Sequence, residues 1–240
     1  AAESHVDRSI ASPDEFVHTN CDGTNVMCDV ARRIGVERFL HISTDEVYGS
    51  IEEGSFTESD ALSPRSAYSA SKAGSDLIAL AYGTTYGLPV VVTRSSNNYG
   101  PYQFPEKVIP LFVTNLLDGK KVPLYGDGMN VRDWCYVEDN CAGVDLVLRA
   151  GTAGEIYNIG AGNEISNRDL TGAILELLGH DESMISYVED RLGHDRRYSI
   201  DTAKVRALGW APQREFRDGL AETVAWYRDG RSWWEPLAAR

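Results

Sequence analysis

Apolar residues follow two different spacings along the first hundred residues, and these spacings predict helices that alternate with short strands. The order is a helix over 12–35, a strand over 36–42, a helix over 67–86 and a strand over 88–94. Ser12 or Asp14 can cap the first helix, and Gly35 and Gly87 can end the two helices. Helix, strand, helix and strand at these lengths predict βαβ units, and therefore an α/β fold with a parallel sheet.

The pattern changes after Asn98, where prolines and glycines interrupt the chain. The elements predicted beyond this point are a helix over 106–117, a strand over 156–160, a helix over 167–179 with Asn167 as candidate cap, and an amphipathic helix over 216–227. Neither a repeat nor a flexible linker is visible. We therefore expect a sheet domain formed by 1–100 and 133–160, which merges into a smaller α+β lobe formed by 101–132 and 161–240.

Composition narrows the class of protein and of partner. The chain has 240 residues, a hydrophobic content of 42% and a formal net charge of -13. A negative net charge argues against a nucleic-acid partner, whose phosphates it would repel. The four cysteines have neither disulfide-framework nor zinc-site spacing, so we expect reduced thiols and no metal site.

Two further patterns bear on location. No apolar run approaches the roughly 20 residues that a membrane span needs. The first residues, Ala1 to His5, show neither the basic nor the apolar region of a signal peptide. We therefore expect a cytoplasmic protein without a membrane partner.

A Tyr-x-x-x-Lys motif, Tyr68 to Lys72, begins the second predicted helix. Residues four apart lie on one helical face, so the phenol and the ammonium can reach one region together. A nearby cation favours a phenolate, and we therefore expect Lys72 to lower the pKa of Tyr68 and make it a general base. The motif alone is weak, since this spacing is common on ordinary helix surfaces.

A polar stretch, Ser43 to Gly49, directly follows the strand over 36–42 and contains Thr44, Asp45 and Glu46. Ligands bind at the carboxyl ends of strands in open parallel sheets. Two carboxyls crowded in one desolvated site shift each other's pKa, so that one can serve as acid and the other as base. The alternative interpretation of this stretch alone is a solvated loop.

Five motifs occur in one order along the chain: 1–9, 43–49, 68–72, 97–103 and 190–195. Together they closely resemble the dTDP-glucose 4,6-dehydratases, a family of extended short-chain dehydrogenases/reductases. The resemblance covers the chain to about Trp234 and implies a Rossmann-like, doubly wound sheet with a substrate lobe. The Asp45-Glu46 pair favours a dehydratase, because nucleotide-sugar 4-epimerases generally lack it.

The resemblance implies a lyase reaction that recycles NAD. Tyr68 would take the 4-hydroxyl proton while NAD⁺ accepts the C4 hydride, and Thr44 would hydrogen-bond that oxygen. Glu46 would then remove the C5 proton, and Asp45 would protonate the departing C6 hydroxyl. The hydride would return to C6, which gives a 4-keto-6-deoxy sugar nucleotide.

The resemblance also assigns binding roles. Residues expected to touch NAD are Ala1, Ala2, Ser43, Tyr68, Lys72 and Asn98. Residues expected to touch the nucleotide-sugar are His5, Asn97, Glu106, Lys107, Arg132, Asn167, Arg191, His194 and Tyr198. Local cations, with Arg196 as a further candidate, could bind the diphosphate despite the negative net charge. By contrast, His18, His41 and His180, and the aromatic residues at 226, 227, 233 and 234, are interpreted as structural.

Two expectations concern the rest of the protein. This family opens with a G-x-x-G-x-x-G turn for the pyrophosphate, which is not seen here, so we expect that roughly 80 residues, or two to three β-α units, precede Ala1. By resemblance the helices over 14–35 and 67–86 form a homodimer bundle.

Two alternatives stay open from the sequence. One is another nucleotide-sugar enzyme, such as a UDP-glucose 4,6-dehydratase. The other is a catalytically silent fragment that binds sugar nucleotides. The intact set of Thr44, Asp45, Glu46, Tyr68 and Lys72 argues against the silent fragment, because binding alone does not require it.

Overall fold

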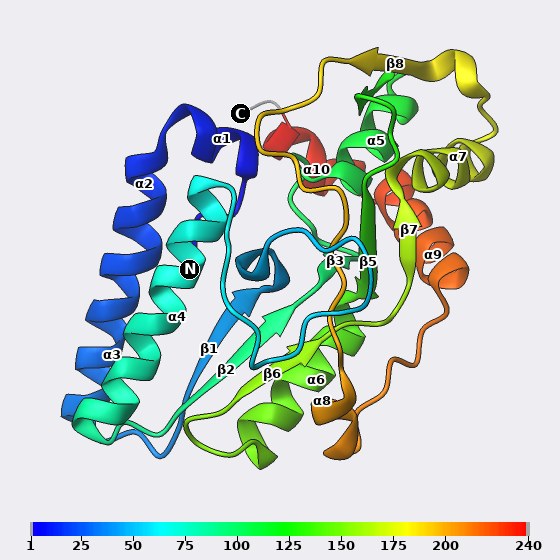
Figure 1. Ribbon diagram of the computed structural model, residues 1–240. Coiled ribbons are helices and arrows are strands. Elements are labelled where there is room, and N and C mark those ends of the chain that lie inside the picture. Colours follow the sequence, from blue (N-terminus) through cyan, green and yellow to red (C-terminus); the bar gives the residue numbers. More distant parts are fainter. Residues whose placement is uncertain (1, 239–240) are drawn as a thin grey trace.

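A parallel sheet with helices on both faces forms the centre of the computed structural model, which describes residues 2–238 (Figure 1). Its strands lie in the order β1-β2-β6 and are β1 (Phe39–Thr44), β2 (Val90–Ser95) and β6 (Ile156–Ile159). All pairings are parallel, and Thr44 lies opposite Ser95, which lies opposite Ile159. The three strands predicted from the sequence are therefore confirmed, with small differences at their ends.

The alternation of side chains along β2 explains how one buried strand holds helices on both sides. Val90 and Val92 pack against α3 (Gly23–Ile34) and α4 (Ala67–Tyr86), whereas Val91 packs on the opposite face with Val147 of α6 (Val137–Ala150). Complete burial of each valine contributes roughly 1.5–3 kcal/mol. The carboxyl ends of β1 and β2 are thereby fixed relative to the first turn of α4.

The helix expected over 12–35 is divided in the structure. It consists of α2 (Pro13–Val17), a π-helical turn at His18–Asp22 and α3, and it is preceded by an unpredicted α1 (Val6–Ala11). Ser12 occupies the N-cap position of α2, but its side chain makes no capping hydrogen bond, and Asp14 lies inside the helix. Ser12 therefore stands at the predicted cap position without forming the capping hydrogen bond, and Asp14 is not the cap. Gly35 does end α3, at φ 68°.

The second lobe is built around α5 (Val108–Leu117), α7 (Asn167–Leu178), α9 (Phe216–Asp229) and α10 (Arg231–Ala238). Two small sheets support these helices, β3-β5-β7 (Asn97–Tyr99, Val131–Tyr136, Glu164–Ser166) and β4-β8 (Val122–Tyr125, Ile185–Val188). A last short helix, α8 (Ala203–Ala207), packs on β6. The cap of α7 is Ser166, which accepts the Asp169 N–H, so Asn167 was predicted one position late.

The aromatic residues near the C-terminus pack as the sequence predicted. Tyr227 and Trp234 are buried in the core of the second lobe, and Trp226 and Trp233 pack against it. The indole of Trp234 donates to the carbonyl of Tyr227 at 2.7 Å. All four cysteines are free thiols. Among the described residues, no helix is both long and apolar enough to cross a membrane.

Candidate active site

A cleft of about 670 Å³ opens where the carboxyl ends of β1 and β2 meet the second lobe. Its walls come from the segment after β1, the first turn of α4, the start of α5, strand β5 and the loop over 191–198. In Figure 1 the loop that follows β8 passes in front of these strand ends. Ligand sites at the ends of parallel strands are expected for such sheets.

Tyr68 lies in the first turn of α4 and faces the cleft. Ser66 caps this helix in a reciprocal capping box with Ser69, which fixes the direction of the turn that carries the phenol. Phe16 of α2 contacts the ring of Tyr68 edge-on, at 6.3 Å between centroids. Burial and capping therefore hold the Tyr68 side chain at the cleft wall.

Lys72 lies one turn further along α4 and is buried behind the cleft wall. Its ammonium donates to the Ile42 carbonyl at 2.6 Å, near the end of β1. It does not line the cleft. Burial lowers the pKa of Lys72, while Asp76 one turn further on opposes that shift.

The expected lowering of the Tyr68 pKa by Lys72 is not found. Burial raises the pKa of Tyr68, and the charges of Glu46, Asp45 and Asp76 raise it further, against a hydrogen bond from Thr44. The spacing of Tyr68 and Lys72 in the sequence shows only the cation four residues away. It does not show that desolvation and facing carboxylates outweigh a cation directed at a carbonyl.

The polar stretch after β1 folds into a short 3-10 helix, Asp45–Tyr48, capped by Thr44. The Thr44 hydroxyl accepts the Glu46 N–H at 3.3 Å and donates to the Asp45 carboxyl at 3.3 Å. Thr44, Asp45 and Glu46 all line the cleft. The tight turn brings neighbouring carboxyls to one side, which a continued strand would not do.

The two carboxyls have different electrostatic surroundings. Burial raises the pKa of Asp45 well above its usual range, and the charges of Glu46 and Asp133 raise it further. Burial also raises the pKa of Glu46, but three cations, Arg132, Arg191 and Lys107, oppose this shift. The surroundings of Asp45 therefore favour its protonated form. The cations around Glu46 favour its carboxylate, which suits Glu46 to act as the base.

The residues predicted to bind the nucleotide-sugar all line this one cleft: His5, Asn97, Glu106, Lys107, Arg132, Asn167, Arg191, His194 and Tyr198. They come from segments far apart in sequence. Arg132 is buried over the Tyr198 ring at 4.1 Å and donates to the Asp195 carbonyl at 2.9 Å. The family resemblance assigned these residues to nucleotide-sugar binding, and the fold brings them together at one cleft.

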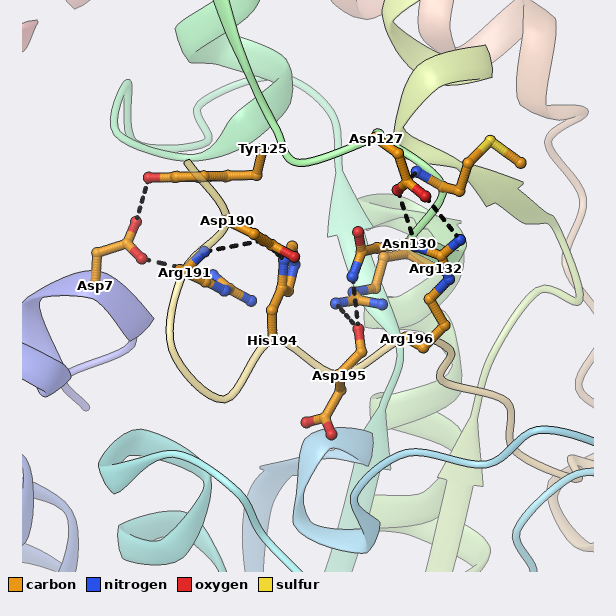
Figure 2. A network of polar contacts seen from close by, with 11 residues as sticks. Asp7, Tyr125, Asp127, Asn130, Arg132, Asp190, Arg191, His194, Asp195 and Arg196 are labelled. Atoms are coloured by element: carbon orange, nitrogen blue, oxygen red, sulfur yellow. Dashed lines mark hydrogen bonds and ion pairs between the residues drawn. The ribbon is translucent and has the colours of Figure 1, made fainter. Parts of the chain in front are cut away.

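Figure 2 shows how the loop over 190–196 is held across the cleft. The His194 ring lies 2.6 Å from Asp190, and Arg191 lies 3.8 Å from Asp7 of α1. The Tyr125 hydroxyl donates to the same Asp7 carboxyl at 3.3 Å. Asp7 of α1 thus receives polar contacts from both the loop and β4.

Of the residues singled out from the sequence, Arg196 and Ala2, like Lys72, lie outside the cleft lining. Arg196 forms a two-pronged ion pair with Asp127, at 2.9 and 3.1 Å, and does not line the cleft, so this diphosphate candidate was wrong. Ala2 is exposed and outside the cleft lining, and Ala1 falls outside the described residues.

Several buried polar atoms at the cleft have no hydrogen-bond partner among the described residues: Ser43 Oγ, Asp45 Oδ2, Ser95 Oγ, Ser96 Oγ, Asn97 Oδ1, Asn98 Oδ1, Gln103 Oε1, Asn140 Oδ1 and Arg191 Nε. Each unpaired buried group costs roughly 1–3 kcal/mol. Such a concentration at one cleft fits a ligand rich in hydroxyl, amide and phosphate groups, as nucleotides and sugars are.

Sequence reasoning missed Asp7, Gln103, Tyr125 and Asn140, which also belong to this cleft or its rim. Asp7 and Gln103 fall inside the motifs at 1–9 and 97–103, which were the available clue, but no role was assigned to them. Tyr125 and Asn140 lie outside all five motifs and reach the site only through the tertiary fold.

Comparison with known proteins agrees with this geometry. A family model described as GDP-mannose 4,6 dehydratase matches residues 1–223. The chain is 61% identical to a dTDP-glucose 4,6-dehydratase of Streptomyces antibioticus, over the whole chain and 72% of that protein. The chain belongs to the family of dTDP-glucose 4,6-dehydratases.

Solved structures of the family agree with the fold. The dTDP-glucose 4,6-dehydratase of Streptomyces venezuelae, crystallised with NAD, superposes with a TM-score of 0.98 at 61% identity. The match covers 99% of this chain and 74% of that one. A UDP-glucose 4-epimerase of Thermotoga maritima also matches, at 30% identity and a TM-score of 0.90 over 96% of this chain and 76% of that one. The Rossmann-like α/β fold predicted from the sequence is thereby confirmed.

Proposed function

We propose that this protein is a hydro-lyase that converts dTDP-glucose into dTDP-4-keto-6-deoxyglucose and leaves its NAD unchanged. The observation that carries this proposal is the meeting of Thr44, Asp45, Glu46 and Tyr68 at one cleft, with opposed surroundings for the two carboxyls. Two relatives, 61% and 60% identical to this chain, are named dTDP-glucose 4,6-dehydratase.

Oxidation at C4 is the first step of the proposed reaction. Tyr68 takes the 4-hydroxyl proton, and Thr44, whose hydroxyl lies beside it, orients the sugar oxygen. NAD, when bound, supplies the hydride acceptor for C4 and the hydride that returns to C6. Ser43 Oγ and Asn98 Oδ1 at the cleft have no partner within residues 2–238, and they suit cofactor amide and hydroxyl groups.

Elimination of water is the second step, and the ketone at C4 makes it possible by acidifying the C5 proton. Glu46 removes that proton, since three cations favour its charged form. Asp45 donates a proton to the departing C6 hydroxyl, since its surroundings favour the neutral form. Glu46 therefore removes a proton in the elimination, and Asp45 supplies one to the leaving hydroxyl.

Binding of an anionic substrate by an acidic protein requires local cations. Lys107, Arg132 and Arg191 line the cleft although the whole chain carries a net charge of -13. Lys107 also donates to the Ser4 carbonyl at 2.5 Å, which fixes it at the rim. Guanidinium groups bond phosphate oxygens in pairs, and this suits Arg132 and Arg191 to the diphosphate.

A substrate panel tests the proposal. The protein supplied with NAD should convert dTDP-glucose to a product lighter by one water, and should do so faster than it converts UDP-glucose. Faster conversion of UDP-glucose would favour the UDP-glucose 4,6-dehydratase. Binding of both without conversion would favour the catalytically silent binding protein.

The same proposal includes a division of the chain and an assembly. We assign 1–100 and 133–160 to the cofactor domain, and 101–132 and 161–240 to the sugar-nucleotide lobe. We also assign a homodimer, supported by apolar side chains exposed on α3, namely Val26, Met27, Val30 and Ile34. A cytoplasmic location accords with these assignments.

A further inference from the structure

The loop between β3 and α5, residues 100–107, carries a cleft residue to which the proposed reaction assigns no task. This residue is Gln103, whose side chain lines the cleft. Its amide oxygen, Oε1, is buried and has no hydrogen-bond partner among residues 2–238. An acceptor that has lost water and gained no donor is unfavourable, so a ligand that supplies a donor at this point is bound more tightly.

The orientation of the Gln103 amide is set by the backbone beside it. The side-chain nitrogen, Nε2, donates to the carbonyl of Asn98 at 2.9 Å. The reverse orientation would place two oxygens against each other, because a carbonyl oxygen accepts and does not donate. The nitrogen is therefore held on β3, and the oxygen is the atom presented to a ligand.

The backbone of the loop is fixed by two helices of the protein. The hydroxyl of Tyr227, a core residue of α9, donates to the backbone carbonyl of Gln103. Gly100 has a φ of 146°, and a Cβ added there would lie 2.6 Å from Cγ1 of Val137, the first residue of α6. The loop therefore passes α6 too closely for a side chain at this position, and it is bonded to α9 three residues later.

The residue before Gln103 has a backbone conformation that residues other than glycine rarely adopt. Tyr102 has a φ of 64°, and within the described part of the chain it is the one non-glycine residue with a positive φ. Its ring packs against the rings of Trp226 and Trp233, at 4.6 and 5.4 Å between centroids. Such a conformation persists where surrounding contacts enforce it, and it is found preferentially at ligand sites. Tyr102 thus contacts the aromatic residues of α9 and α10, while Gln103 lines the cleft.

The position of Gln103 in the chain indicates which ligand it meets. The loop leads from β3 to Glu106 and Lys107, which line the same cleft, and it belongs to the lobe that we assign to the sugar nucleotide. In the proposed reaction, the 4-hydroxyl and the 6-hydroxyl of glucose meet the side chains that carry the chemistry. The hydroxyls at C2 and C3 are the sugar donors that remain, and neither changes during the reaction.

We propose that Gln103 is a substrate-binding residue, whose Oε1 accepts a hydrogen bond from the 2-hydroxyl or the 3-hydroxyl of the glucose unit. The bond involves no proton transfer, because the amide is a neutral group that accepts through its oxygen. It holds the sugar ring while C4, C5 and C6 react. This inference rests on the proposed function for the identity of the sugar, but not for the orientation of the amide.

Two substrate analogues, dTDP-2-deoxyglucose and dTDP-3-deoxyglucose, test the proposal through their dissociation constants. Each analogue lacks one of the two candidate donors. The wild-type protein should bind one of them about tenfold more weakly than dTDP-glucose, because the missing hydroxyl leaves Oε1 unpaired in the complex. Isothermal titration calorimetry without added NAD measures the constants, so that the sugar is not oxidised during the titration.

Gln103→Met removes the acceptor and keeps a side chain of similar length. In this variant the same analogue and dTDP-glucose should bind within about twofold of each other, because the hydroxyl and the acceptor are coupled only when both are present. Gln213→Met is the matched control, because Gln213 is exposed, donates to the nearby Ala211 carbonyl at 3.0 Å and lies outside the cleft. The control should keep the wild-type difference.

The outcomes separate this inference from the proposed function. The same preference for dTDP-glucose over each analogue in the wild-type protein and in Gln103→Met would overturn the inference, and would make Gln103 a brace between the loop and β3. Gln103→Leu takes the place of Gln103→Met if that variant does not fold. Coupled binding without turnover would support the inference and contradict the proposed function, whereas a protein that binds none of the three nucleotides would contradict both.

Discussion

The pKa of Tyr68 depends on the charged groups that face its side chain. Its pKa is raised by burial, and then by Glu46 and Asp45, so the phenol must lose its proton to solvent before it can act as the base. Tyr68→Phe should lower turnover by about 10²–10⁴-fold, because the phenolate serves as the general base. Wild-type turnover should also rise with pH through the titration of Tyr68, and the variant should lose this dependence. Steady-state rates across pH measure both, and an unchanged rate would exclude the role.

Glu46 and Asp45 are adjacent in sequence, but their proposed tasks can be separated. Glu46→Gln should block removal of the C5 proton and spare oxidation at C4, so NADH should accumulate on the protein. Absorbance of NADH and exchange of the C5 proton with deuterated solvent follow the two steps. Glu52→Gln, at an exposed position, is the control. Normal C5 exchange in Glu46→Gln would assign the base elsewhere.

At the scale of single residues, sequence reasoning succeeded where motifs are contiguous. Thr44, Asp45 and Glu46 could be found because strand, turn and carboxyls follow one another. The orientation of Lys72 could not be predicted, since the Ile42 carbonyl that it binds comes from another element.

Helix α4 carries Tyr68 in its first turn. The cap of this helix therefore helps to fix the position of Tyr68 at the cleft. Ser66→Ala removes the side-chain acceptor for the Ser69 N–H, which should cost roughly 1 kcal/mol of unfolding free energy. Thermal or denaturant unfolding measures this loss. Ser186→Ala, on exposed β8, should change stability little. Equal losses in both variants would show that the cap does not stabilise α4.

Elements with clear apolar spacing were predictable, whereas most of the short strands were not, and the 14-residue helix α6 and the six-residue strand β5 were also missed. The strands of the central sheet and helix α4 follow from apolar spacing and terminal glycines. Strands β3, β4, β7 and β8 have three or four residues each, too few for a period to show. The π-helical turn at His18–Asp22 likewise has no distinctive spacing in the sequence.

At the scale of the whole molecule, the exposed apolar face of α3 predicts self-association. Met27→Glu should shift the protein from dimer to monomer, because a charge at this face opposes burial against a second copy. Light scattering during gel filtration measures the change. Leu177→Glu, at a similarly exposed position on α7, is the control and should leave the assembly intact. A dimer that survives Met27→Glu would place the interface elsewhere.

The proposed reaction moves hydride from C4 to C6 of the sugar while water is lost. The most direct measurement supplies dTDP-glucose carrying deuterium at C4 and locates the label in the product. We expect a 4-keto product that has lost one water and carries the deuterium at C6. A product of unchanged mass, as an epimerase would give, or a dehydrated product without deuterium at C6, would contradict it.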